Sequence, residues 1–239
     1  MITLYGGPTP NARKIAIALE EMDLTWRLEL IDILAGDQLT PEFRSLNPNN
    51  KSPVIVDDDA EGGAEPFVLW ETGAILLYLA EKTGRFRPAA RRERAICQQW
   101  LMFQVSGVGP MFGQNAHFAF YAKDRHPYAI ERYANEVTRL LRVLEGRLSE
   151  SRFLAGADYT ISDMATYPYV LRQVESRRTE FLALARWSDE IGARPAVQRG
   201  MDIGREALRA ETIEGGLSGL SDEQRSILFG DRQYGGARR

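Results

Sequence analysis

The stretch Asn47-Pro48-Asn49-Asn50-Lys51-Ser52-Pro53-Val54-Ile55-Val56-Asp57 sets the organisation of the first third of the chain. Its Asn-rich half is typical of a turn, and the β-branched residues after Pro53 are typical of a short strand. A proline at a strand entrance lies at an edge or a tight turn and leaves neighbouring backbone groups unpaired. Those groups could pair with an extended peptide ligand, although a plain turn before a strand is the simpler interpretation.

Periodic patterns on both sides of this stretch predict a small α/β layer. Before it, they predict a strand over 2–5, a helix over 12–22, a strand over 25–31 and a loop or short helix over 41–46. After it, they predict a strand over 66–70 and an apolar helix over 71–82. This order of elements predicts a mixed sheet, with one parallel pair joined through the first helix.

The remainder of the chain has no convincing strand pattern and predicts an all-helical second domain. Helical periodicity covers residues 91–105, 128–148, 162–175, 180–193 and, more weakly, 196–210. We therefore expect an α/β domain over 1–83, a linker over 84–88, a helical domain over 89–211 and a Gly-rich extension over 212–239. The polar composition of the extension predicts loose packing or disorder.

Composition excludes several classes of protein. The chain has 239 residues, 30 Lys plus Arg, 33 Asp plus Glu and a formal net charge of -3. Its single cysteine, Cys97, cannot form an internal disulfide. One cysteine and two histidines are too few ligands for a zinc site, so no metal is expected. No run reaches the roughly 18 apolar residues of a membrane-spanning helix, and no basic leader opens the chain. We expect a cytoplasmic protein with no membrane partner.

The two parts of the chain differ in charge. Residues 1–83 hold 6 basic and 14 acidic side chains, net -8, whereas residues 84–239 hold 24 and 19, net +5. The second part is rich in arginine, but its interspersed acids and the negative total argue against nucleic-acid binding. Solvated helix faces account better for these arginines.

Three short segments carry the chemistry. Thr9-Pro10-Asn11 lies at the turn into the first helix, where backbone N–H groups and the positive helix end favour anions. Glu71-Thr72 opens the apolar helix, and Pro53 stands at the strand entrance described above. Taken singly, each segment is weak evidence for a site: a helix cap is the favoured interpretation of Thr9 and Asn11, and it also explains Glu71-Thr72. The first turn carries no cysteine, so any thiol chemistry there must use a thiol that the ligand brings.

Together and in this order, these segments resemble the glutathione transferase superfamily over residues 1 to about 205. The resemblance rests on Asn47-Pro48-x-x-Lys51-x-Pro53-Val54-Ile55, on Glu71-Thr72-x-Ala74-Ile75-x-x-Tyr78-Leu79, and on Gly156-Ala157-Asp158-Tyr159-Thr160-Ile161-Ser162-Asp163. It implies a thioredoxin-like N-terminal domain followed by an all-helical domain. Thr160-x-x-Asp163 also has the spacing of a capping box, with Asp as the acidic partner.

Within the superfamily, the chain is most similar to the bacterial Nu-class, disulfide-bond oxidoreductase group. That similarity rests on Tyr5-x-x-Pro8-Thr9-Pro10-Asn11-x-x-Lys14, on residues 107–115 and on residues 128–133. It implies reduction of a small disulfide by glutathione, with oxidised glutathione or two glutathione molecules in one subunit and no protein cysteine involved. Cys97, in a predicted helix, is accordingly interpreted as a buried core thiol.

The resemblance also implies roles for individual residues. Thr9 would hydrogen-bond the glutathione sulfur and Asn11 would orient the disulfide or thiolate. Val54, after a cis Pro53, would offer its main chain to the cysteinyl part, and Glu71 and Thr72 would hold the γ-glutamyl amine and carboxylate. Weaker candidates for the same ligand are Gln38, Lys51 and Arg132.

Two departures from the family pattern leave the activity open. Conjugating classes place Tyr or Ser at the catalytic turn, whereas here Tyr5 belongs to the strand and Thr9 takes the turn position. Thr72 stands where Ser is common, which keeps the hydroxyl. A conjugating transferase for small electrophiles, or a glutathione-binding regulator with little turnover, therefore remain alternatives.

Two further expectations concern surfaces. The resemblance implies a two-fold homodimer, with the helix around 98–112 and the N-terminal domain in the contact. An aromatic cluster, His117, Phe118, Phe120 and Tyr121, either lines the pocket for the second substrate or belongs to the core or an interface; the sequence does not distinguish these.

Overall fold

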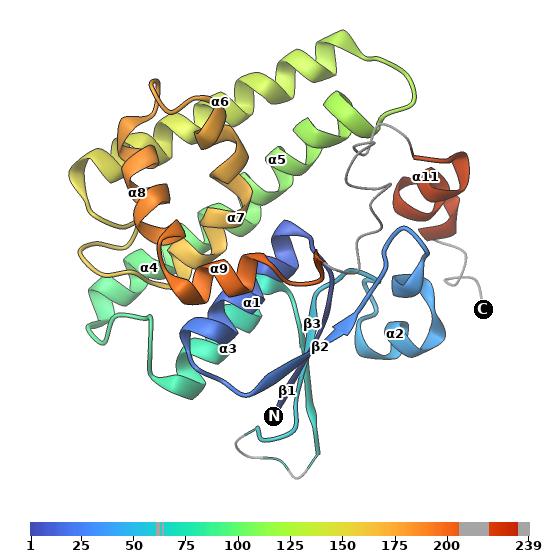
Figure 1. Cartoon of the computed structure of the whole chain (residues 1–239), viewed down its shortest axis with the longest axis horizontal. Helices are drawn as coiled ribbons and strands as arrows, with labels where there is room; N and C mark the ends of the chain where they lie inside the picture. The colour runs from blue at the N-terminus through green and yellow to red at the C-terminus, as the bar shows by residue number, and fades with distance from the viewer. Residues whose placement is uncertain (61–62, 64, 206–219, 234–239) are drawn as a thin grey trace.

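A computed structural model describes residues 1–60, 63, 65–205 and 220–233 of the chain. Its single sheet has the strand order β2-β1-β3-β4. The strands are β1 (Ile2–Gly6), β2 (Trp26–Leu30), β3 (Val54–Asp57) and β4 (Phe67–Trp70). β1 and β2 are parallel, and β3 is antiparallel to both β1 and β4. The predicted mixed sheet with one parallel pair is confirmed (Figure 1).

Helices cover both faces of this sheet. α1 (Pro10–Glu21) and α3 (Thr72–Thr83) contact each other and pack toward the helical half of the molecule. On the opposite face lie a short 3-10 turn, η1 (Asp37–Leu39), and α2 (Pro41–Leu46). There Phe43 of α2 is buried against Ile31 and Val54. The sheet, covered on both faces, is the thioredoxin-like domain that the resemblance implies.

The rest of the described chain is helical. Its elements are α4 (Arg91–Phe103), η2 (Gln104–Val108), α5 (Gly109–Ala116), η3 (His117–Tyr121), α6 (Pro127–Glu150), α7 (Ile161–Ser176), α8 (Leu182–Gly192), α9 (Pro195–Met201), α11 (Asp222–Phe229) and η6 (Asp231–Gln233). Both η2 and η3 are π-helical turns, which often occur at functional sites, and η6 is a 3-10 turn. The all-helical second domain is confirmed, whereas its boundaries, with the linker over 84–88, stay predictions.

A single buried apolar cluster joins the two halves. It extends from Leu4 and Ile17 to Val170 and Trp187, so α1 is packed between the sheet and helices α7 and α9. Gly200 permits the close approach of α9, because a Cβ there would lie 2.6 Å from the backbone nitrogen of Ile17. The helical domain is thereby fixed against α1, the helix whose N-terminus was predicted to bind an anion.

The structure corrects two sequence expectations. Residues 109–121 were not among the predicted helices, because Gly109, Pro110 and Gly113 obscure helical periodicity, yet they form α5 and η3. The extension was predicted to be loosely packed or disordered, and this is wrong over 220–233. There α11 begins with a capping box of Ser221 and Gln224 and buries Ile227. The remaining parts of the extension, 212–219 and 234–239, lie outside the described residues.

Two other predicted features, a cis proline and a capping box, are confirmed. The Ser52-Pro53 peptide bond is cis. Thr160 and Asp163 form the expected capping box at the start of α7. In the part of the chain that the structure describes, no helix is long and apolar enough to cross a membrane.

Candidate active site at the cleft between the two domains

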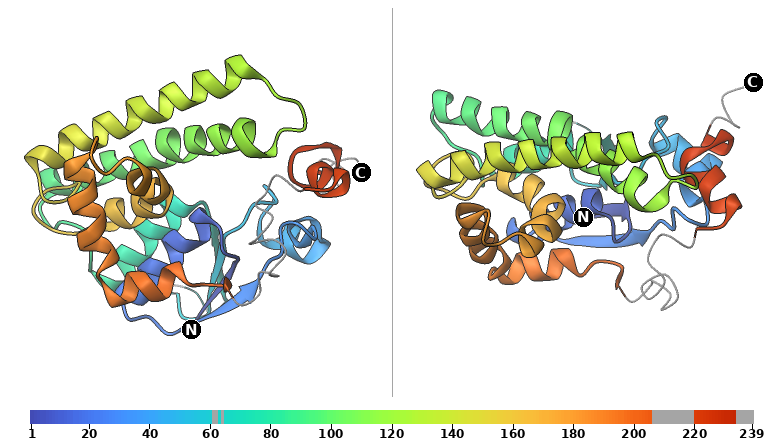
Figure 2. Two further views of the ribbon diagram at one scale, coloured as in Figure 1. Left: turned by 45° about the horizontal axis from the view of Figure 1, so that its top comes forward. Right: turned by 90° about the horizontal axis from the view of Figure 1, so that it is seen from above.

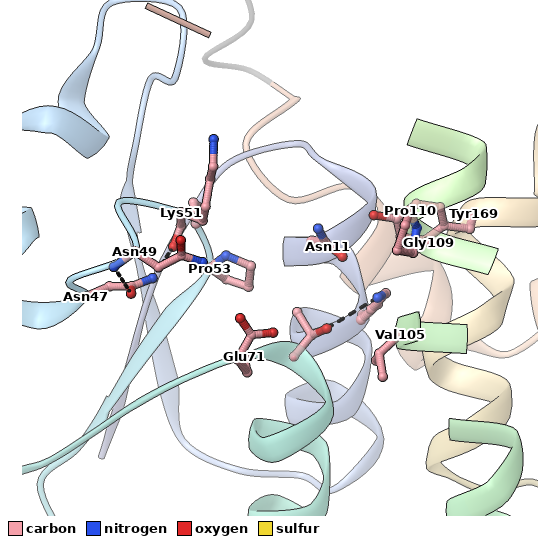
Figure 3. A pocket seen from close by; sticks show the side chains of 13 residues that line it. Asn11, Asn47, Asn49, Lys51, Pro53, Glu71, Val105, Gly109, Pro110 and Tyr169 are labelled. Atoms are coloured by element: carbon pink, nitrogen blue, oxygen red, sulfur yellow. Dashed lines mark hydrogen bonds between the residues drawn. The ribbon is translucent and has the colours of Figure 1, made fainter. Parts of the chain in front are cut away.

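A cleft of about 260 Å³ lies where the sheet domain meets the helical domain. Asn47, Asn49, Lys51, Ser52 and Pro53 form one side, and Val105, Gly109, Pro110 and Tyr169 form the other. Asn11, Lys14, Glu71 and Thr72, at the beginnings of α1 and α3, lie between these two walls. Figure 3 shows Glu71 in the gap between Pro53 and Val105. The cleft thus combines residues of both domains and two helix N-termini.

The first helix begins with the predicted polar turn. The Thr9 hydroxyl oxygen caps α1 by accepting a hydrogen bond from the Ala12 N–H at 3.3 Å. This capping does not use the hydroxyl hydrogen, which can still be donated to a ligand anion. Asn11 lines the cleft and hydrogen-bonds the side chain of Tyr169. The capping interpretation of Thr9 and a role toward a ligand are therefore compatible.

The loop before β3 is held in shape by one buried side chain. Asn47 is 2% exposed, and its Nδ2 donates to the Lys51 carbonyl at 2.6 Å while its Oδ1 accepts from the Asn49 N–H at 2.9 Å. This arrangement presents Lys51, Ser52 and the cis Pro53 to the cleft. Lys51 Nζ donates to Oε1 of Gln233 at 2.9 Å, and partial burial lowers the pKa of Lys51.

The beginning of α3 carries an unusual backbone. Glu71 has φ 70° and ψ 114°, a left-handed conformation that costs a non-glycine residue about 1–3 kcal/mol. Its side chain is exposed, whereas Thr72 beside it is 8% exposed. Strain of this kind concentrates at functional sites, which supports the selection of Glu71-Thr72 from the sequence.

The structure adds Lys14, which was part of a sequence motif but not a predicted site residue. Lys14 is 1% exposed, and its Nζ donates to Gln104 Oε1 at 2.7 Å and to Thr72 Oγ1 at 3.3 Å. The amine lies 4.7 Å from the centre of the Tyr169 ring. Burial lowers the pKa of Lys14 to about 7, although the charge of Glu71 opposes that shift. Lys14 precedes the run Ile15-Ala16-Ile17-Ala18-Leu19, and this apolar run signals a helix with little solvent-facing surface.

Tyr169, Val105 and Pro110 are also cleft residues that were not selected from the sequence. Burial raises the pKa of Tyr169 to about 12, so its hydroxyl stays protonated at neutral pH. These residues are far from Glu71 in sequence, and only the packing of α7, η2 and α5 brings them to the cleft.

Four predicted residues lie outside the cleft lining: Thr9, which caps α1 beside it, and Gln38, Arg132 and Val54. Gln38 is 5% exposed and its Nε2 donates to the Ile33 carbonyl at 3.2 Å, within the turn before α2. Arg132 is on the surface of α6, 3.8 Å from the Glu136 carboxylate. Val54 begins β3 directly after Pro53, with its side chain fully buried, so only its main chain could meet a ligand.

The aromatic cluster packs against the C-terminal extension. His117 and Tyr121 contact the Phe229 ring at centroid distances of 4.5 and 5.9 Å, and Phe118 stacks on Tyr133 at 5.4 Å. Phe120 is 45% exposed beneath the Arg172 guanidinium. Figures 1 and 2 show α11 beside both the end of α5 and the region of α2. His117 and Tyr121 therefore form an interface with α11, and none of the four residues lines the cleft.

Cys97 is separate from this chemistry. It is 1% exposed within α4, where hydrogen bonds link it to Thr160 and Ser162 at the start of α7. Burial raises the pKa of Cys97, which disfavours a reactive thiolate. In residues 1–60, 63, 65–205 and 220–233, no group of three or more His, Cys, Asp or Glu could hold a metal ion.

A thioredoxin-like sheet joined to an all-helical domain, with polar helix N-termini at the cleft between them, is the architecture of glutathione transferases. Family models give the same answer: the glutathione S-transferase N-terminal domain matches residues 9–82, and the C-terminal domain matches residues 111–195. The chain belongs to the glutathione S-transferase family.

Two bacterial relatives are similar over most of their length. The disulfide-bond oxidoreductase YfcG of Escherichia coli K12 is 49% identical over 198 residues, which cover 82% of this chain and 92% of the relative. The disulfide-bond oxidoreductase YghU of the same strain is 39% identical over 221 residues, which cover 85% of this chain and 75% of the relative.

Solved structures support the same family assignment. A glutathione transferase from Burkholderia graminis, with two glutathione molecules bound per subunit, matches with a TM-score of 0.80 and 42% identity over 84% of this chain and 87% of its own. A glutathione transferase from Pseudomonas putida, with one glutathione disulfide bound per subunit, matches with a TM-score of 0.80 and 40% identity over 84% of this chain and 91% of its own.

Proposed function

We propose that this protein is a glutathione-dependent disulfide-bond reductase that uses ligand thiols and no cysteine of its own. One observation carries the proposal. The helix N-terminus at the cleft, where a redox-active cysteine would be stabilised as a thiolate, carries Thr9 and Asn11, and the single Cys97 is buried in α4. The relatives named disulfide-bond oxidoreductase, and the structures with two glutathiones or one glutathione disulfide per subunit, support this activity.

The reaction is a thiol–disulfide exchange in two steps. The thiolate of one glutathione attacks a sulfur of the substrate disulfide, forming a mixed disulfide and releasing one substrate thiolate, which takes up a proton. A second glutathione thiolate then attacks the glutathione sulfur of the mixed disulfide. The products are oxidised glutathione and the second substrate thiol, so two glutathiones are oxidised for each disulfide reduced.

The chain contributes binding and charge stabilisation. The Thr9 hydroxyl donates to the attacking thiolate, and the positive end of α1 lowers its pKa. Asn11, held by Tyr169, orients the sulfur. Glu71 pairs with the γ-glutamyl amine, and Thr72 with the α-carboxylate at the N-terminus of α3. Pro53 and the main chain of Val54 hold the cysteinyl part, and Lys51 contacts the remainder of the ligand.

Gln38 and Arg132 stay weaker proposals. Each is engaged elsewhere, Gln38 with the Ile33 carbonyl and Arg132 beside Glu136. Both would need to move to meet a ligand in the cleft. Their substitution should affect glutathione binding less than substitution of Glu71.

The proposal extends to assembly and location. We propose a two-fold homodimer in the reducing cytoplasm. Met102 of α4 and Phe67 of β4 support the dimer, because these large apolar side chains are 44% and 41% exposed on the parts that the family resemblance assigns to the contact.

Conjugation of glutathione to small electrophiles is the alternative activity, since the same cleft would bind glutathione. A glutathione-binding regulator would keep binding without turnover. The first experiment is therefore the steady-state rate of glutathione-dependent reduction of a model disulfide, measured beside conjugation of a chlorinated nitroaromatic on one sample. Fast reduction with slow conjugation supports the reductase. The reverse ranking, or binding with neither reaction, contradicts it.

Thr9→Ala tests the residue roles, and the chain offers a matched control. Thr40 caps α2 as Thr9 caps α1: its hydroxyl accepts from the Phe43 N–H at 3.3 Å, and a proline follows it. Both variants should lose about 1 kcal/mol of cap stabilisation. Only Thr9→Ala should lower turnover in disulfide reduction, by roughly 10²-fold, the order found for a lost donor to a reacting anion. Equal turnover in the two variants would show that Thr9 is a cap and nothing more.

A further inference from the structure

The amine of Lys14 is buried without an ion-pair partner among the described residues. Its hydrogen-bond partners, Gln104 and Thr72, are neutral, and the face of Tyr169 covers it from α7. Among the described residues, Lys14 forms no salt bridge. A buried cation with only neutral hydrogen-bond partners is costly, because water is excluded and the charge of Glu71 opposes the loss of hydration without offsetting it.

The hydrogen-bond directions connect this group to the cleft. Lys14 donates to Thr72 Oγ1, so the hydroxyl hydrogen of Thr72 is directed elsewhere. Thr72 lines the cleft at the start of α3, where backbone N–H groups also favour an anion. An anion at Thr72 would therefore receive the hydroxyl hydrogen and lie next to the buried amine.

We propose that Lys14 is a positioning residue for the α-carboxylate of glutathione, and that seating this carboxylate at Thr72 draws a proton onto the Lys14 amine. Glutathione binding and proton uptake are thus coupled. This inference rests on the proposed function and adds a linkage that the reductase activity does not require. The amine acts through Thr72, so it need not touch the reacting sulfur.

Few other groups around Lys14 could account for proton uptake in its place. Glu71, at the start of α3, favours the charged amine. Burial raises the pKa of Tyr169 on α7 to about 12, so this hydroxyl stays neutral. The contact from η2 is the uncharged side chain of Gln104. β1 has no charged residue. α9 packs against the far end of α1, where Arg194 and Arg199 pair with Glu21 and Glu20.

Burial gives the amine a suitable range of titration. With its pKa lowered to about 7, most of the ligand-free protein carries a neutral Lys14 at pH 8. An adjacent carboxylate raises that pKa and so favours protonation. Below pH 6 the amine is already charged, and binding should take up almost no proton at this site.

Titration calorimetry of S-methylglutathione at pH 8 tests the coupling, using buffers with different enthalpies of ionisation. This probe has no thiol proton, so thiolate formation does not contribute. We expect the parent protein to take up roughly 0.5–0.9 proton per site. Lys14→Met should bind about tenfold more weakly and take up less than roughly 0.2 proton. Lys14→Arg, whose charge is permanent, should recover the affinity without the uptake.

The outcomes separate this inference from the function on which it rests. Binding by the parent with no uptake, or equal uptake by parent and Lys14→Met, overturns the role of Lys14 and leaves disulfide reduction intact. Failure of the parent both to bind S-methylglutathione and to reduce a model disulfide overturns both proposals. The parent measurement is decisive even where Lys14→Arg fails to fold.

Discussion

Asp163 and Lys14 are both buried ionisable residues, but their partners differ. The Asp163 carboxylate accepts hydrogen bonds from the Leu154 N–H, the Trp187 Nε1–H and both the N–H and the hydroxyl of Thr160, at 2.9–3.1 Å. Burial raises the pKa of Asp163, and these four donors oppose that shift. Lys14 has two neutral acceptors and a ring face.

The difference agrees with a structural role for Asp163 and with the ligand role that we propose for Lys14. Asp163 is fully satisfied within the fold and joins α7 to α8 and to the preceding loop. Lys14 is left short of negative charge at the edge of a cleft. A group that the protein itself does not complete is available for completion by a ligand.

The largest expected effect is on stability, from Asp163→Ala. This change leaves the Trp187 and Leu154 N–H groups buried and unpaired, so unfolding free energy should fall by about 3–5 kcal/mol. Urea denaturation measures this loss of unfolding free energy, and Asp163→Asn should cause a smaller loss. A loss below about 1 kcal/mol would remove the contrast between the two sites.

Lys14→Met should change how stability depends on pH in the ligand-free protein. Because the folded-state pKa of Lys14 lies near 7, below that of the unfolded chain, the unfolded state binds more protons between these values and parent stability rises with pH there. Relative to Lys14→Met, the parent should gain about 2–3 kcal/mol between pH 6 and pH 9.5. Parallel stability curves for the two proteins would contradict a titrating Lys14.

Gln104→Glu would give Lys14 the counter-ion that it lacks. The new carboxylate, replacing an acceptor 2.7 Å from Nζ, should keep the amine protonated. The pH-dependent gain in stability should then fall below about 1 kcal/mol, and S-methylglutathione should bind more weakly. A gain as steep as in the parent protein would mean that Gln104 does not control the titration.

The smallest effect is expected for Cys97→Ala. This thiol is buried close to the Asp163 network, so its removal should cost about 1 kcal/mol or less of stability. Disulfide reduction should proceed at the parent rate. Lost activity with an unchanged melting temperature would place a protein thiol in the mechanism and sink the ligand-thiol proposal.

Most of the fold was predictable because its signals are local. Alternation and short strand-like runs indicate β1 to β4, and the Thr160-x-x-Asp163 spacing marks the start of α7. The helices over 109–121 were not predicted, since Gly109, Pro110 and Gly113 give a poor helical pattern and their conformation depends on packing against α6. α11 was missed although Ser221 and Gln224 have the spacing of a capping box, because the Gly-rich composition of the extension predicted loose packing.

The site was predictable where it coincides with helix starts. Thr9, Asn11, Glu71 and Thr72 stand at such positions and can be recognised in the sequence. Tyr169 and Val105 could not be found in this way, since tertiary packing alone brings α7 and η2 to the cleft. Lys14 was not selected from the sequence, although the apolar run after it signals a helix with little solvent-facing surface; its complete burial singles it out.

The contacts of the C-terminal extension have a consequence for ligand concentration. α11 and η6 contact both domains: Phe229 packs on His117, Ile227 approaches Gly36, and Gln233 accepts a hydrogen bond from Lys51. A ligand that uses Lys51 must displace an intramolecular partner whose effective concentration is on the order of millimolar. Glutathione present at comparable concentration could compete with that partner, whereas a scarce ligand of equal intrinsic affinity would leave the extension in place.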